Sequence, residues 1–283
     1  MNILPIPQLL EEIPDAPKQL YYVGNFPDEN KYKFLAVVGS RKFTSYGKQV
    51  CEHLIRGLAG HPIVIVSGLS LGVDSIAHAA ALENNLITVA VPGSGLDPKV
   101  LYPASNRALA QKILDARGAL VSEFEPDFKA TNWSFPKRNR IMAGMAHAVL
   151  VIEAEEKSGT RITARLATEY NRDVLTVPGS IFSSASDGTN ALLYEGATPV
   201  RNAHDIIEAL GLDPQVNNSK QESLFEHLTE DEQRVLNFID EPKSRNMINE
   251  HLGTTIMQTN ILLSSMEIKG LIKESLGKIM RIR

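Results

Sequence analysis

The strongest constraint on the fold is an alternation, beginning at Phe34, of short β-branched apolar runs with turns and helical patterns. The runs start with FLAVVG at 34–39 and PIVIVSG at 62–68, and continue at 86–93, 119–124, 147–154, 174–179 and 198–201. Strands that are apolar on both faces, with helices between them, form parallel sheets covered on each side. The sequence therefore predicts an α/β fold with a doubly wound, mostly parallel sheet.

Residues outside this alternation predict the domain boundaries. Residues 1–33 hold five prolines and no sustained periodicity, which indicates an N-terminal arm with a short helix, packed on the edge of the core domain at 34–211. The stretch GLDPQVNNSKQES at 211–223 is polar and rich in turn-forming residues. We expect a linker at 212–223.

A second, smaller domain is expected at 224–283. Thr229 followed by Glu232 is a capping box at the start of a helix, and two more helical patterns and a hairpin around Gly277 follow. This order of elements predicts a winged helix. The expected recognition helix, TIMQTNILLSSMEIK, carries one cation, Lys269, whereas duplex-binding helices make several phosphate contacts. We expect protein interaction here, with weak auxiliary DNA contact as the alternative.

Composition narrows the classes of partner. The formal net charge is −4, so the chain as a whole does not attract polyanions and any anion site must be local. A single cysteine, Cys51, excludes an internal disulfide framework and a multi-cysteine metal site. Neither a signal peptide pattern nor a long uncharged apolar stretch is present. We expect a cytoplasmic protein without a membrane partner, a metal or a cofactor.

Glycine- and serine-rich turns follow several predicted strands, as in Gly39-Ser40-Arg41, Ser67-Gly68 and Ser158-Gly159-Thr160. Glycine lets a ligand approach the backbone, and helix N-termini favour anions through free N–H groups and the helix dipole. The alternative is that tight turns simply need these residues. The spacing fits neither a P-loop nor G-x-G-x-x-G, so we expect neither ATP hydrolysis nor NAD binding.

The segment FPKRNRIMAG at 135–144 places Lys137, Arg138 and Arg140 around Asn139 at the start of a predicted helix. The helix dipole disfavours cations there, so a phosphate nearby is the expected partner, and Asn139 is a candidate base contact. The alternative is an ion-pair cluster with Asp127 or Glu125.

Three aromatic residues, Phe43, Trp133 and Phe135, accompany these cations. They are expected either to pack in the core or to stack on bases, which stabilises single-strand binding without demanding a particular base sequence. Cations interleaved with aromatic residues favour a single-stranded DNA binder.

The motifs together resemble the DNA-processing protein A (DprA/Smf) family. The resemblance covers most of residues 20–202 and is carried by VVGSRKFTSYG, IVSGLSLGVDSIAH, AVPGSGLDPKVLYPASN, SEFEP, FPKRNRIMAG, EAEEKSGTRITARLA and VPGSIFSSASDGTNALLYEGA. It implies an extended Rossmann-like fold and a protein that binds and protects incoming single-stranded DNA, forms a homodimer and loads the RecA recombinase in natural transformation, without catalysis of its own.

The resemblance also implies which residues contact nucleotides or phosphates. By position these are Gly39, Ser40, Arg41, Phe43, Ser67, Gly68, Lys137, Arg138, Asn139, Arg140, Ser158, Gly159 and Thr160.

Some positions depart from the family. Many members begin with a helical domain, whereas about 33 residues precede the first strand here. His147 stands where Ser or Asp is common, and we expect it to be structural.

The rival prediction is a nucleotide-processing enzyme of the LOG-like phosphoribohydrolase class, which has P-G-G-x-G-T-x-x-E. Thr163 occupies the position of its glutamate, so Asp74 or Glu169 would have to supply the acid.

Overall fold

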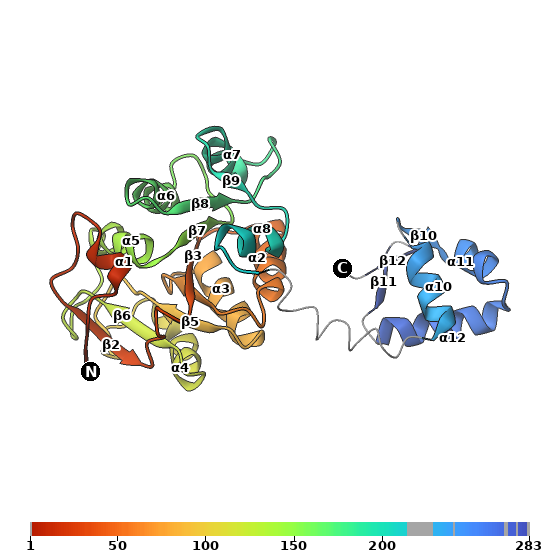
Figure 1. Ribbon diagram of the computed structural model, residues 1–283, viewed down its shortest axis with the longest axis horizontal. Coiled ribbons are helices and arrows are strands. Elements are labelled where there is room, and N and C mark those ends of the chain that lie inside the picture. Colours follow the sequence, from red (N-terminus) through yellow and green to blue (C-terminus); the bar gives the residue numbers. More distant parts are fainter. Residues whose placement is uncertain (1, 214–228, 240, 269–270, 276, 282–283) are drawn as a thin grey trace. The chain divides into compact units, whose positions relative to one another are not determined.

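The fold is described from a computed structural model of the chain, which covers residues 2–213, 229–239, 241–268, 271–275 and 277–281. The chain forms two compact units, Met1–Asn217 and Asn218–Arg283 (Figure 1). Positions 214–223 of the expected linker and 224–228 of the expected second domain lie outside the described residues.

Within residues 2–213, the first unit is built on a nine-stranded sheet in the order β1-β2-β6-β5-β4-β3-β7-β8-β9. Seven neighbouring strands of this sheet are parallel to one another, from β6 through β5, β4, β3, β7 and β8 to β9. They are β3 (Lys33–Val38), β4 (Ile63–Ser67), β5 (Ile87–Ala90), β6 (Ala119–Ser122), β7 (Ala148–Val151), β8 (Asp173–Thr176) and β9 (Thr198–Pro199). The predicted doubly wound, Rossmann-like sheet is confirmed.

The N-terminal segment extends this sheet. It forms β1 (Asn2–Leu4), α1 (Gln8–Glu11) and β2 (Leu20–Gly24), and β2 pairs antiparallel with both β1 and β6. The sequence predicted an arm because prolines dominate the connection between the two strands, and because β1, with three residues, is too short to show a periodic pattern. Leu10 and Ile13 are buried against Gly144, where a Cβ atom would lie 2.6 Å from the Leu10 side chain.

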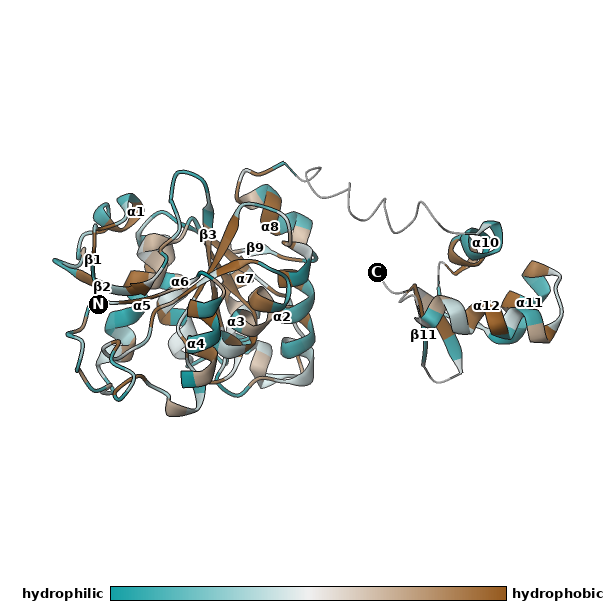
Figure 2. Ribbon diagram, turned by 90° about the horizontal axis from the view of Figure 1, so that it is seen from below, coloured by the Kyte–Doolittle hydropathy of each residue, from teal (hydrophilic) through white to brown (hydrophobic). Residues whose placement is uncertain are grey.

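Helices cover both faces of the sheet. Phe34, Ala36 and Val38 of β3 belong to one core cluster with α5 (Ser134–Met145), α6 (Gly159–Glu169) and α7 (Asp187–Tyr194), which follows a 3₁₀ turn at Ser184–Ser186. Leu35 and Val37 belong to the opposite cluster, with α2 (Ser45–Gly57), α3 (Val73–Glu83) and α8 (Ala203–Ala209). Figure 2 shows the apolar strands between helices whose outer faces are polar.

A further helix of the first unit, α4 (Arg107–Asp115), follows a 3₁₀ turn at Ala104–Asn106 and contacts α3, β5 and β6. His147 lies at the start of β7 and has a structural role, as expected. Its Nδ1 accepts a hydrogen bond of 3.1 Å from the Phe34 amide, and burial lowers its pKa to about 4, so the ring is neutral.

The second unit contains α10 (Glu230–Phe238), β10 (Lys243–Ser244), α11 (Arg245–Leu252), α12 (Ile256–Ile268), β11 (Ile272–Ser275) and β12 (Lys278–Arg281). The Thr229–Glu232 capping box is formed, and β12 pairs antiparallel with both β10 and β11. Val235, Ile248 and Leu263 lie in its apolar core. This order of elements fits a winged helix, and the assignment stays a prediction.

No helix in the described part of the chain is long and apolar enough to cross a bilayer.

Candidate nucleic-acid interface

The candidate site lies where the winding of the sheet reverses. β3 and β7 are central neighbours, and the chain continues from β3 to one side of the sheet and from β7 to the other. Crevices of this kind beyond the carboxyl ends of parallel strands bind ligands. A cavity of about 510 Å³ lies here, and its lining includes Gly39, Ser40, Arg41, Lys42, Asp74, Asn132, Phe135, Pro136, Arg138, Asn139, Glu155, Ser158, Gly159, Thr160 and Thr163.

Buried Glu153 shapes the turn between β3 and α2. Its carboxylate accepts hydrogen bonds from the amide (2.9 Å) and the hydroxyl of Thr44, the N-cap of α2, while its carbonyl accepts one of 2.9 Å from the Ser40 amide. Gly47 leaves room for this carboxylate, since a Cβ would lie 2.2 Å from Glu153 Oε2. Glu153 was not among the residues predicted for the site, although an acidic residue at the end of an apolar run was a usable signal.

The N-terminus of α6 faces the cavity from the β7 side. Ser158 is its N-cap and accepts a hydrogen bond of 3.1 Å from the Thr160 amide. A Cβ atom at Gly159 would meet no atom within 4 Å, so the backbone there is open to a ligand. Because the N-terminus of a helix carries partial positive charge, this turn is suited to an anion.

Arg41 and Phe135 form the opposite wall. The Arg41 guanidinium carbon lies 5.0 Å from the Phe135 ring centroid, and the half-exposed Tyr102 ring lies 5.7 Å from the same ring. Among the described residues, no carboxylate lies within ion-pair distance of Arg41. An exposed guanidinium held over an aromatic ring keeps its charge available to a ligand.

Arg138 has a different environment from that of Arg41. Its side chain is buried, and its Nη1 donates to the carbonyl oxygens of Gly68 (2.5 Å) and Val91, which follow β4 and β5. Burial lowers the pKa of Arg138 to about 10, and the negative charge of Asp74 opposes this shift. The expected role of Arg138 in holding a phosphate stays a prediction. Its side chain lines the cavity, but carbonyl oxygens already occupy Nη1, which joins the loops after β4 and β5.

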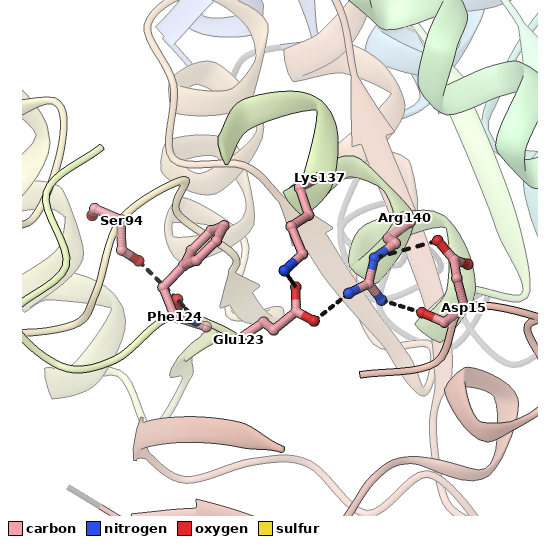
Figure 3. A network of polar contacts seen from close by, with 7 residues as sticks. Asp15, Ser94, Glu123, Phe124, Lys137 and Arg140 are labelled. Atoms are coloured by element: carbon pink, nitrogen blue, oxygen red, sulfur yellow. Dashed lines mark hydrogen bonds and ion pairs between the residues drawn. The ribbon is translucent and has the colours of Figure 1, made fainter. Parts of the chain in front are cut away.

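The structure directs Lys137 and Arg140 to a carboxylate (Figure 3). Glu123, directly after β6, pairs with Lys137 at 3.4 Å and accepts a short hydrogen bond from Arg140. Arg140 also donates to the Asp15 carbonyl at 2.6 Å and pairs with its carboxylate at 3.4 Å. An ion-pair cluster therefore exists, with Glu123 and Asp15 in place of the expected Asp127 or Glu125.

The other predicted residues divide between cavity and core. Asn139 is 9% exposed and lines the cavity, whereas Ser67 is fully buried and donates to the Val37 carbonyl at 2.7 Å. Gly68 supports Arg138 from outside the cavity lining, and a Cβ there would lie 2.0 Å from Nη1. Phe43 is 44% exposed and follows the cavity-lining Lys42.

Of the two carboxylates that the rival enzymatic prediction offers as the acid, only Asp74 belongs to the described lining of the cavity. Asp74 lines the cavity, and burial raises its pKa while the positive charge of Arg138 opposes the shift. Glu169 pairs with Arg165 at 3.4 Å and is not part of the cavity lining. Thr163, which occupies the position of the glutamate in the LOG-like phosphoribohydrolase motif, is buried in the cavity wall.

Comparisons with known proteins agree with this geometry. The chain is 44% identical over 198 residues to DNA processing protein DprA of Streptococcus pneumoniae, an alignment spanning 70% of this chain and 68% of that protein. It is 34% identical to Protein Smf of Escherichia coli, over 98% of this chain and 75% of the relative.

A solved structure of DNA processing protein A from Helicobacter pylori superposes with a TM-score of 0.65 at 36% identity, over 74% of this chain and 94% of the other. That structure is described as giving insight into a single-stranded DNA binding mode. The family model for DNA recombination-mediator protein A matches residues 5–211. The chain therefore belongs to the DNA recombination-mediator protein A family of DNA processing proteins.

Proposed function

We propose that the protein binds single-stranded DNA, with backbone phosphates held in the cavity at the carboxyl ends of β3 and β7. The observation that carries this proposal is the exposed guanidinium of Arg41, which has no carboxylate partner in the described part of the chain. It lies over Phe135 and lines the same cavity as the N-terminus of α6. The single-stranded DNA binding described for the Helicobacter pylori relative supports it.

The roles follow from the environment of each residue. Arg41 contacts a phosphate, and the backbone of Gly39-Ser40 and Ser158-Gly159-Thr160 lets phosphate oxygens approach the amides. Asn139 contacts a base edge or the sugar, and the exposed Phe43 ring stacks on a base. Lys137, whose side chain is 43% exposed, adds a contact at the rim. Arg138, Arg140, Ser67 and Gly68 support the site indirectly.

Binding of labelled oligonucleotides across salt concentrations tests this proposal. If two or three phosphates are neutralised, log affinity for a single strand falls with log salt at a slope of about −1.4 to −2. Single strands should bind more tightly than duplexes of equal length, because stacking needs unpaired bases. Flat salt dependence, or equal affinity for both forms, would contradict the proposal.

We further propose, on family membership, that the protein is cytoplasmic, forms a homodimer and loads RecA onto protected single strands in transformation. Light scattering at micromolar concentration should give twice the mass of 31.1 kDa. Addition of the protein should speed RecA filament assembly on strands covered by single-strand-binding protein. A monomeric mass, or unchanged assembly, would refute the corresponding part.

One observation favours the enzymatic alternative. Asp74 is a buried carboxyl in the cavity whose pKa is raised by burial, which is a property of general acids. However, it already accepts a hydrogen bond from the Ser70 amide at 3.2 Å. We expect no base to be released from nucleoside monophosphates. Release that is lost in Asp74→Asn would replace the DNA-binding proposal with a phosphoribohydrolase.

A further inference from the structure

Trp133 is the only tryptophan in the sequence, and it lies beside the cavity with 55% of its surface exposed. It is the N-cap of α5, between Asn132 and Phe135, which both line the cavity. Exposed apolar rings that gather at the mouth of a ligand site mark a candidate interaction surface.

The indole is held in place by two other rings. Phe124 and Phe128 stack with centroids 4.5 Å apart, and Trp133 meets them edge to face at 5.7 and 5.5 Å. Edge-to-face contacts of this kind fix the orientation of a ring. Trp133 is therefore both exposed and preorganised, so a ligand that stacks on it loses little of its affinity to ordering the side chain.

Positive charge accompanies this ring. The Lys137 ammonium lies 5.9 Å from the Trp133 ring and 5.6 Å from the Phe124 ring. Glu123 is its ion-pair partner and also pairs with Arg140, which has a second carboxylate partner in Asp15. The Lys137 side chain is 43% exposed, so a ligand can reach its ammonium. The surroundings of Trp133 thus match an apolar ring that is attached to an anion, as in a nucleotide.

We propose that Trp133 is a base-stacking subsite outside the cavity, occupied by an unpaired nucleobase, with Lys137 on the adjoining phosphate. The inference rests on the proposed single-strand binding and extends it. The strand runs from the Arg41 and Phe135 side of the cavity across the N-terminus of α5 to Trp133. Because stacking does not read base edges, this subsite adds affinity for single strands without selecting their sequence.

The test uses the full-length protein and an oligothymidylate, and it follows two signals in one titration. Tryptophan emission reports only Trp133, and the anisotropy of a dye on the oligonucleotide reports binding. We expect emission to be quenched in step with anisotropy. Trp133→Ala should bind the single strand about fivefold to 150-fold more weakly, whereas Trp133→Phe should retain most of the affinity.

Duplex DNA separates stacking from a general structural effect. Its bases are already stacked and paired, so Trp133→Ala should change duplex affinity less than twofold. Unchanged emission during saturable binding, with wild-type affinity in Trp133→Ala, would overturn this subsite while the proposed function stands. If Trp133→Ala fails to fold, quenching in the wild type and the affinity of Trp133→Phe still show whether a base stacks on this ring. Absence of any oligonucleotide binding would instead remove the proposed function itself.

Discussion

Arg41 is stacked on Phe135, with 5.0 Å between the guanidinium carbon and the ring centroid. The two residues come from the turn after β3 and from the first turn of α5, and sheet topology alone brings them together. The contact gives the cavity an exposed, oriented cation.

Arg41→Ala should weaken single-strand binding and make the salt dependence shallower by about 0.7 in slope, because one phosphate contact is lost. Arg41→Lys should recover part of the affinity but not the two-point grip of the planar guanidinium. Anisotropy titrations across salt measure both effects. Arg165→Ala, which removes an exposed cation of α6 outside the cavity lining, is the control and should bind like wild type. An Arg41→Ala protein with the original slope would show that Arg41 contacts no phosphate.

Arg138→Ala should lower the free energy of unfolding by about 3 kcal/mol, since it leaves the carbonyls of Gly68 and Val91 and the carboxyl of Asp74 without their buried donor and charge partner. Urea unfolding monitored by circular dichroism measures this loss. The salt slope of the folded fraction should stay that of wild type. If Arg138→Ala is as stable as wild type and its affinity depends less steeply on salt, Arg138 contacts a phosphate.

Glu123→Gln should have opposite effects on stability and binding. Removing the carboxylate that Arg140 and Lys137 share should cost about 1–2 kcal/mol of stability, while Lys137 becomes free to contact DNA and affinity rises. Paired urea and anisotropy measurements test this. Glu169→Gln, which breaks an exposed ion pair with Arg165, should change stability by less than about 0.5 kcal/mol. If Glu123→Gln binds single-stranded DNA more weakly than wild type, Lys137 does not contact the DNA.

Stability should fall with acidification. His78 is fully buried with its Nδ1 2.7 Å from the Thr88 hydroxyl, and burial lowers its pKa from 6.5 to about 3. The unfolded chain therefore binds one more proton than the folded protein between these pH values. The free energy of unfolding decreases as pH falls below 6.5, by up to about 1.4 kcal/mol per pH unit from this group.

Urea titrations between pH 4.5 and 7.5 should show a smaller pH dependence in His78→Asn than in wild type. His53→Gln, at an exposed position of α2, should leave the wild-type dependence unchanged. The half-buried His147 adds a contribution of the same sign, so some dependence should persist in His78→Asn. Identical curves for His78→Asn and wild type would exclude His78 as its source.

Periodicity and turn chemistry were sufficient to predict the seven parallel strands, the glycine-rich turns at their carboxyl ends and the hairpin around Gly277. Each of these has a signature among residues that are close in the chain, namely an apolar run or a cluster of turn residues, so it is visible locally even though the strands pair with distant partners. The family resemblance, which the family model confirms over residues 5–211, likewise rests on contiguous motifs.

Only the tertiary structure decided how the cations of FPKRNRIMAG are used. Successive residues of a helix point about 100° apart, so Arg138 turns under the loops after β4 and β5 while Arg140 turns toward Asp15 and Glu123. The strands formed by residues 2–24 and the buried carboxylate of Glu153 depend equally on partners distant in the chain. The sequence determined which charges are present, and the long-range contacts decided which remain available to a ligand.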